Sequence, residues 1–96
     1  MAKADSYIAT KGAHTRNASL GTAVSIAVPA GSTLLLIAAE TQDARITFDG
    51  TTPTATVGFR LYAGRDPFSF FVNSTMTVKV IEAVAGGVVN YQFLEL

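Results

Sequence analysis

Residues 44–59 read ARITFDGTTPTATVGF, and the change of pattern inside this stretch decides the fold class. Up to Phe48, apolar side chains alternate with polar or charged ones, the period-two pattern of a strand with one buried and one wet face. The Asp49-Gly50 dipeptide ends this pattern, because the aspartate can bond its own backbone and glycine tolerates positive φ. We therefore predict a β-strand over residues 44–48 that ends in a sharp turn.

An ordered loop is predicted after this turn. Pro53 cannot donate a hydrogen bond to a sheet, and it restricts Thr52 to extended conformations. The residues through Thr56 are dense in β-branched side chains, so a stiff loop is favoured over a flexible linker. Gly58 then releases the chain into a second apolar stretch over residues 59–63.

Further strands are predicted where short apolar stretches alternate with turn residues. Residues 22–28 alternate with period two, and residues 33–40 are apolar on both faces, which favours a central strand covered on both sides over a short helix. The connections at residues 41–43 and 85–87 are short enough for hairpins, the second because Gly-Gly permits the primed turns. The other strands are predicted over residues 59–62, 68–72, 76–83 and 89–93.

About seven short strands separated by turns predict an all-β fold, a small antiparallel β-sandwich or barrel-like sandwich. This domain is predicted over residues 21–96, after an extended N-terminal arm over residues 1–20. The arm carries only three large apolar side chains, Tyr7, Ile8 and Leu20, without an amphipathic face. Two interpretations stay open: a frayed terminus, or an arm that becomes ordered against a neighbouring subunit.

The composition points to protein partners. Of the 96 residues, 49% are hydrophobic and 15% are charged, which predicts apolar surface hidden against neighbouring subunits. The formal net charge is zero, so we expect no nucleic-acid partner, and the longest apolar run, residues 34–39, is too short to span a membrane. Residues 1–39 hold three basic residues against one acidic, and residues 40–96 hold four against six, so the arm could meet the body of another copy.

No combination of residues predicts a catalytic or cofactor site. His14 is the single histidine and lies in the predicted arm, and no serine occupies a Gly-x-Ser-x-Gly turn. Glu40, Asp43 and Asp49 do not follow calcium-loop spacing, the glycines form no phosphate loop, and the absence of cysteine excludes a disulfide framework. We therefore expect a protein that is not an enzyme and binds no cofactor or metal.

The segment RITFDGTTPTATVGF, residues 45–59, followed by Ala63-Gly64, resembles a recurrent pattern in small all-β structural proteins of tailed bacteriophages. The resemblance extends from about residue 28 to the last residue. A shorter part, an aromatic residue followed by Asp-Gly-Thr-x-Pro-Thr, also resembles the strand and turn of small sandwich domains attached to polysaccharide hydrolases.

The phage resemblance implies a non-enzymatic virion structural protein. It would be a capsid-associated decoration or cement protein, or a minor head or tail component, made in the host cytoplasm and located in the virion. Its partners would be itself, as a homo-oligomer with a trimer expected by analogy, and a major capsid or other virion protein. The alternative is a carbohydrate-binding or adhesion module of a phage or bacterial surface protein, for which the chain offers three tyrosines and no tryptophan.

Three segments are candidate interfaces. Neighbouring Phe70 and Phe71 point to opposite sides of an extended chain, so one of them should lie on a surface that a partner covers. The candidate residues are Tyr7, Ile8, Lys11 and Arg16 of the arm; Asp49, Gly50, Thr51, Thr52, Pro53 and Thr54 of the loop; and Phe68, Phe70 and Phe71 of the aromatic cluster.

Overall fold

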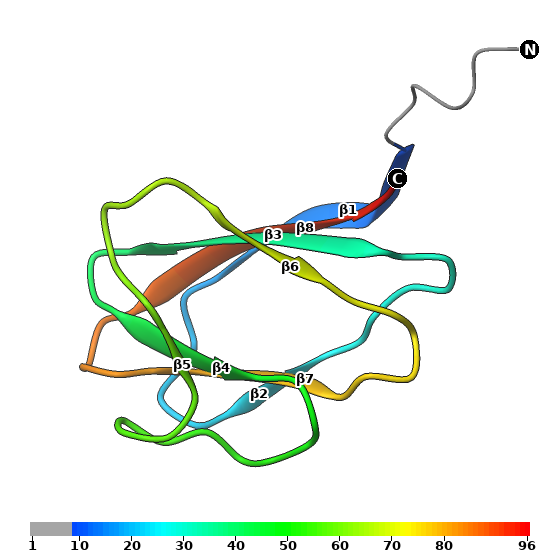
Figure 1. Ribbon diagram of the computed structural model, residues 1–96. Coiled ribbons are helices and arrows are strands. Elements are labelled where there is room, and N and C mark those ends of the chain that lie inside the picture. Colours follow the sequence, from blue (N-terminus) through cyan, green and yellow to red (C-terminus); the bar gives the residue numbers. More distant parts are fainter. Residues whose placement is uncertain (1–8) are drawn as a thin grey trace, which may run out of the picture.

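Two four-stranded antiparallel sheets, packed face to face, form the fold of this computed structural model, which describes residues 9–96 (Figure 1). Sheet A has the strand order β1-β8-β3-β6, and sheet B has the order β2-β7-β4-β5. The predicted all-β antiparallel sandwich is therefore confirmed. The strands are β1 (Ala9–Asn17), β2 (Val24–Ile26), β3 (Leu34–Glu40), β4 (Ala44–Thr47), β5 (Phe59–Leu61), β6 (Phe68–Phe71), β7 (Val78–Glu82) and β8 (Val88–Glu95).

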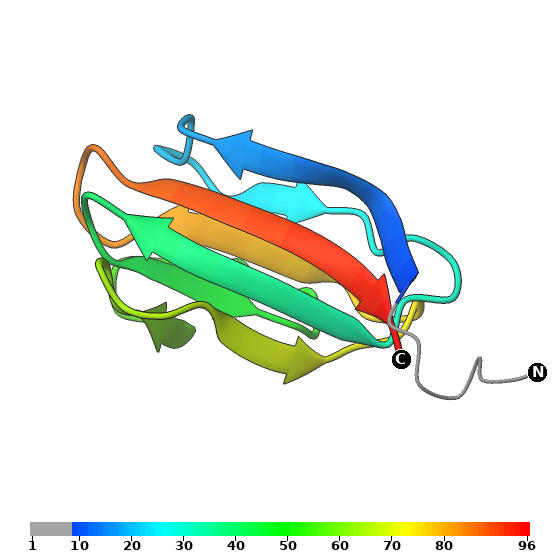
Figure 2. The same ribbon diagram turned by 90° about the horizontal axis from the view of Figure 1, so that it is seen from above.

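Consecutive strands lie in different sheets at every connection except that between β4 and β5. This order, with the two sheets sharing the strands almost in alternation, is that of an eight-stranded jelly roll. The hairpins predicted at residues 41–43 and 85–87 are therefore wrong, because these turns carry the chain from one sheet to the other. The turn residues make the chain reverse its direction. Which sheet the next strand joins depends on strand pairing, and β8 joins sheet A because it pairs with β1 and β3 (Figure 2).

Residues 9–17, predicted to belong to an arm, form the edge strand β1 of sheet A. The strand pairs with β8 from Ala9 opposite Glu95 to Asn17 opposite Val89, and Leu20 after it is fully buried. Most side chains of β1 are exposed, so backbone hydrogen bonds rather than apolar burial hold it, which explains why no periodicity marked it. Within the described residues the sandwich thus begins at residue 9 and not at residue 21.

An irregularity interrupts β1 where Lys11 pairs with Phe93 and Thr15 pairs with Tyr91. Gly12 takes a φ of 73°, and the Gln92 side-chain amide donates to the Gly12 carbonyl oxygen at 3.0 Å. A bulge of this kind disturbs the free edge of a sheet and discourages another strand from pairing there.

The core lies between the sheets and consists of side chains from the inward-facing positions of both sheets and from two connections. In β3 the alternation is strict: the odd-numbered residues 35, 37 and 39 are buried and the even-numbered ones are half-buried or exposed. The buried apolar cluster comprises Leu20, Ile26, Leu35, Ile37, Ala39, Ala44, Ile46, Leu61, Val72, Val78, Val80, Val89 and Phe93.

Asp43 joins three connections at one end of the sandwich. Its carboxylate accepts hydrogen bonds from the Ala63 amide at 2.8 Å and from Arg60 Nε at 2.8 Å, and Arg60 also forms an ion pair with it at 2.7 Å. The Ala83 amide donates to the Asp43 carbonyl oxygen at 2.8 Å. The Ala63 hydrogen bond, followed by the contact with Arg60, holds the pKa of the Asp43 carboxyl below its usual value.

Candidate functional site

Hydrogen bonds hold the Asp49-Gly50 turn in place, some within the turn itself and one to the segment before β7. Asp49 Oδ1 accepts a hydrogen bond from the Thr51 amide at 3.0 Å, and Thr47 Oγ1 donates to the Thr51 carbonyl oxygen at 2.6 Å. The Gly50 amide donates to the Thr77 carbonyl oxygen at 3.1 Å, and Gly50 takes a φ of 88°, which confirms the predicted positive φ. Hydrogen bonds from the Thr51 side chain and backbone lower the pKa of Asp49.

The loop that follows is held against β4 by Arg45. Its Nε donates to the Ala55 carbonyl oxygen at 3.2 Å, and its Nη1 donates to the Gly58 carbonyl oxygen at 3.0 Å. Pro53 is fully buried, whereas Thr52 and Thr54 are exposed. The loop is therefore fixed to the sandwich on one side and presents threonine hydroxyls on the other.

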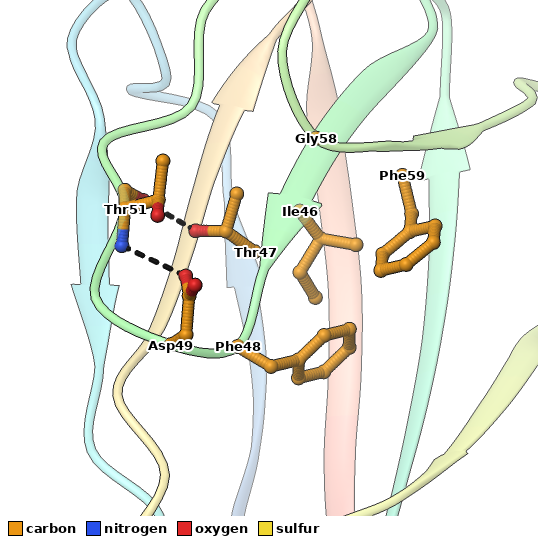
Figure 3. Close-up of a pocket in the computed structure, with 7 residues that line it drawn as sticks. All are labelled: Ile46, Thr47, Phe48, Asp49, Thr51, Gly58 and Phe59. Atoms are coloured by element: carbon orange, nitrogen blue, oxygen red, sulfur yellow. Dashed lines mark hydrogen bonds between the residues drawn. The ribbon is translucent and has the colours of Figure 1, made fainter.

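An open groove of about 510 Å³ lies where this loop returns to β5 (Figure 3). Phe59 at its rim is 67% exposed, although Phe59 pairs with the fully buried Ile46 across β4 and β5. In Figure 3 the Ile46 side chain and the rings of Phe48 and Phe59 lie on one side of β4. The hydrogen-bonded side chains of Asp49 and Thr47 lie on the other. The lining residues are Ile46, Thr47, Phe48, Asp49, Thr51, Gly58 and Phe59.

A chain of aromatic contacts connects this groove with sheet A. The Phe48 ring centroid lies 6.2 Å from that of Phe59 and 4.9 Å from that of Phe70. Phe59 belongs to the edge strand of sheet B and Phe70 to that of sheet A, so Phe48 bridges the two edges. The structure thus places Phe70 of the predicted aromatic cluster against Phe48, the residue that precedes the predicted Asp-Gly loop.

The aromatic cluster itself is divided between two faces of sheet A. Phe68 and Phe70 pack against the core, whereas Phe71 is 79% exposed on the outer face. The prediction that Phe70 and Phe71 point to opposite sides is confirmed. Phe71 lies opposite Leu34 in the strand pairing, and Leu34 in turn lies opposite Leu94.

The candidate arm residues do not project from the sandwich where the structure describes them. Lys11 lies in β1, and its Nζ forms an ion pair with Glu95 Oε1 of the same chain at 3.0 Å. Arg16 is exposed on β1. Tyr7 and Ile8 lie outside the described residues.

Sequence reasoning missed the outer face of sheet A. The run over residues 33–40 predicts a strand covered on both faces, but sheet B covers only the inner face, and Leu34, Leu36 and Ala38 are half-buried on the outer one. The signal was present, because these outward residues are apolar like the inward ones. What the sequence could not show is that no other part of residues 9–96 covers them.

The side chains of the described residues offer few arrangements for chemistry. Residues 9–96 contain no cluster of three or more His, Cys, Asp or Glu side chains that could hold a metal ion. His14 Nε2 lies 3.1 Å from Asn90 Oδ1 on the outer face of sheet A, with no carboxylate in that contact. Among the same residues there is no helix of the length and apolarity that a bilayer span requires.

Comparison with known proteins finds no match: no family model fits the chain, and neither curated proteins nor solved structures give a significant similarity. The fold and its surfaces define a small β-sandwich domain with two largely apolar surfaces that the rest of residues 9–96 leaves uncovered, the loop groove and the outer face of sheet A. Surfaces of this type are characteristic of proteins that bind other macromolecules.

Proposed function

We propose that this protein is a non-enzymatic structural protein of a bacteriophage virion, a capsid-associated decoration or cement protein that stabilises the shell through protein–protein contacts. One observation carries the proposal. The segment that gives the chain its resemblance to phage structural proteins, residues 45–59, also lines the groove and exposes Phe59. A loop that is rigidly held yet presents an aromatic ring to solvent has the properties of a docking surface.

The proposed mechanism is burial of the groove against a shell protein. An apolar side chain of the shell protein enters beside Phe48 and Phe59, and the Asp49 carboxylate and Thr51 supply polar contacts at the rim. Burying an aromatic side chain of this size stabilises a contact by about 1.5–3 kcal/mol. Because the loop is already fixed by Arg45 and Asp49, little conformational entropy is lost on docking.

Each contact is weak, and its effect on the stability of the shell comes from its repetition at many joints. A shell presents the same joint many times, and each occupied joint opposes separation of the subunits beside it. A homo-oligomer that engages several joints at once binds far more tightly than one subunit does, because every contact after the first is intramolecular.

The test uses particles from a phage that encodes this chain. Mass spectrometry of gradient-purified particles should find the protein, and particles assembled without it should bind the purified protein at saturable sites. Phe59→Ser should weaken binding about tenfold or more, since each 1.4 kcal/mol is a factor of ten. The matched control is Val84→Ser, at an apolar residue 51% exposed in the connection between β7 and β8, which should bind like the parent protein. A protein found only in the lysate and never on particles would overturn the proposal.

A carbohydrate-binding or adhesion module is the second candidate, favoured by one feature of the same groove. The exposed Phe59 ring lies at a groove that Asp49 also lines, and sugars bind by stacking on aromatic rings and by hydrogen bonding to carboxylates. A glycan array distinguishes the two candidates: binding that is lost in Phe59→Ser would favour the sugar module, and particle binding without glycan binding would favour the shell protein.

A further inference from the structure

On the outer face of sheet A, three consecutive pairs of outward-facing residues on the two central strands carry no charge. In β3 and β8 the outward-facing positions alternate with buried ones, and they pair across the two strands as Leu34 with Leu94, Leu36 with Gln92, and Ala38 with Asn90. All six are half-buried. An antiparallel sheet that faces water on one side normally carries polar and charged residues there. This face, which is turned toward the viewer in Figure 2, therefore has the composition of a contact surface.

A protrusion stands at one end of this face. Phe71 on the edge strand β6 is 79% exposed, and it extends the row formed by Leu34 and Leu94. The three side chains form an apolar stripe across three strands, with Phe71 raised at its end. A ring exposed to this degree buries a large apolar area when a partner covers it.

A hollow lies toward the other end of the same face. Its volume is about 190 Å³, and its lining includes Leu36, Ala38 and Pro67 together with the polar residues His14, Asn90 and Gln92. The short side chain of Ala38 leaves this space between its larger neighbours. An apolar cavity of about 150 Å³ is known to accommodate benzene, so the hollow is large enough for a phenyl ring.

We infer that two copies of this chain form a two-fold symmetric dimer through the outer face of sheet A, with Phe71 of each copy in the hollow above Ala38 of the other. Phe71 lies beside residue 34 of β3 and the hollow beside residue 38, about 13 Å apart at ~3.3 Å per residue. A two-fold axis between the facing sheets, crossing β3 near Leu36, brings each ring to the level of Ala38 and Pro67 in the other copy, two residues that line its hollow. Both contacts then form together, as a symmetric interface requires.

A second copy of this chain is the partner that fits this surface, because the outer face of sheet A carries both the exposed Phe71 ring and a hollow large enough for such a ring. The axis also runs nearly perpendicular to the strands, so the facing strands are aligned and antiparallel. This is one of the two ways in which sheets pack face to face. A partner of another kind would have to supply a matching ring and hollow at the same separation.

The size of the face sets the expected strength of the dimer. Sheet A has four strands ~4.8 Å apart, of which β6 has four residues and the central β8 has eight, so the face measures at most about 19 by 26 Å, or roughly 1,000 Å² for both copies. Stable complexes bury about 1,600 Å² in total, and interfaces below about 1,200 Å² belong to weak or transient complexes. We therefore expect a dimer that dissociates on dilution.

Salt should have little effect on this association. Of the charged residues on the face, Arg16 lies on the edge strand β1 opposite Asn90 and Glu40 lies at the end of β3, and no charged side chain lies between the stripe and the hollow on β3 and β8. Screening acts on exposed charges and leaves apolar contacts unchanged. Contacts made by the basic residues Lys11 and Arg16 would instead weaken as salt rises.

Analytical ultracentrifugation of the full chain over a hundredfold range of concentration tests the inference. The parent protein should shift from monomer to dimer at the same concentration in low and moderate salt. Phe71→Ser removes the ring and Ala38→Leu fills the hollow, and each should weaken the dimer at least tenfold. Both changes lie on the outer face, so the melting temperature should stay within a few degrees of the parent. Phe59→Ser is the matched control, an exposed phenylalanine in the loop groove that should leave the dimer intact.

A mixture of the two variants shows whether the dimer depends on the specific fit of the Phe71 ring into the hollow or only on the amount of apolar surface. Phe71→Ser keeps its hollow and Ala38→Leu keeps its ring, so the mixed pair retains one complete contact and should associate more tightly than either variant alone. A parent protein that is monomeric over the whole range, a trimer, or a Phe71→Ser variant that dimerises like the parent would each overturn the inference. Particle binding is measured separately, so failure here is distinguishable from failure of the proposed function.

Discussion

Phe70 and Phe71 are adjacent in β6, yet their side chains belong to two different surfaces. The Phe70 ring lies 4.9 Å from the Phe48 ring on the inner side of sheet A, and Phe71 is 79% exposed on the outer side. One four-residue edge strand therefore supports both the groove lined by Phe48 and the proposed dimer contact. A change that twisted β6 would alter both surfaces together.

Gly58 and Gly64 form a matched pair for testing how the loop is held against β4. Gly58 has a φ of 123°, and a Cβ added there would lie 3.1 Å from the Ile46 carbonyl oxygen and 3.2 Å from Arg45 Cβ. Gly64 has a φ of 75° with no atom within 4 Å of such a Cβ. Gly58→Ala combines backbone strain with a clash against a strand, so it should cost about 2–3 kcal/mol, against about 1 kcal/mol for Gly64→Ala.

Urea unfolding of the two variants measures this difference, and particle binding by Gly58→Ala shows whether the loop position affects the groove. Equal destabilisation by the two substitutions would mean that the loop moves away from β4 without cost. In that case the groove is not rigid, and docking would cost the conformational entropy of ordering the loop.

The strands with alternating burial could be predicted, whereas β1 could not. Residues 34–40 and 44–47 can be recognised as strands in the sequence because they contain the apolar residues that a sheet buries. In β1 most side chains are exposed, and the strand exists because its backbone pairs with β8, about eighty residues away in the chain. Pairing over such a distance leaves no local pattern, and the scarcity of large apolar side chains in residues 1–20 suggested an arm instead.

At the candidate site, the Asp49-Gly50 turn could be predicted from the sequence, whereas the contacts among the aromatic side chains could not. Asp49 and Gly50 specify a turn by their own conformational preferences, and the structure has it. The meeting of Phe48 with Phe59 and Phe70 depends on which strands form the edges of the two sheets, a consequence of the jelly-roll order. The uncovered outer face of β3 depends in the same way on where sheet B lies.

Acid should destabilise the protein through Asp43. The Ala63 amide and Arg60 lower the folded-state pKa of this carboxyl, so the ionised form is favoured in the folded chain. Its contribution is fully present above the unfolded pKa of about 4 and is lost as the pH falls through the folded value. Asp43→Asn should therefore destabilise the protein at pH 7, and the difference from the parent should shrink progressively below about pH 4.

Urea unfolding of parent and variant at several pH values between 7 and 3 measures this effect. The control is Asp66→Asn, at an exposed aspartate for which residues 9–96 show no ion pair, and it should lower the stability at pH 7 far less than Asp43→Asn does. A gap between parent and Asp43→Asn that stays constant over the whole range would show that the connections at residues 43, 63 and 83 are held by other contacts. Asp49, whose pKa is also lowered, contributes to the slope of both proteins equally.

Two truncations separate the terminal residues from the strand that follows them. Deleting residues 2–8 leaves β1 complete and should change the melting temperature by only a few degrees. Deleting residues 2–18 removes β1 together with its six pairs to β8 and the Lys11–Glu95 ion pair, and it leaves a core strand as an open edge. That variant should melt more than about 10 °C lower or aggregate, because 1 kcal/mol corresponds to about 4–8 °C in a domain of this size.

The shorter truncation also tests whether Tyr7 and Ile8 act as apolar anchors on a neighbouring subunit or shell protein. If they do, deleting residues 2–8 should weaken binding to particles that lack the protein while leaving the sandwich folded, and the binding that remains should respond differently to salt. The measurement is a binding titration of the intact and truncated proteins at low and moderate salt, with melting curves as the folding control. Equal affinity would remove these residues from the interface and leave attachment to the groove at Phe59. A stable, soluble protein lacking residues 2–18 would contradict the role assigned to β1 as a strand of the sandwich.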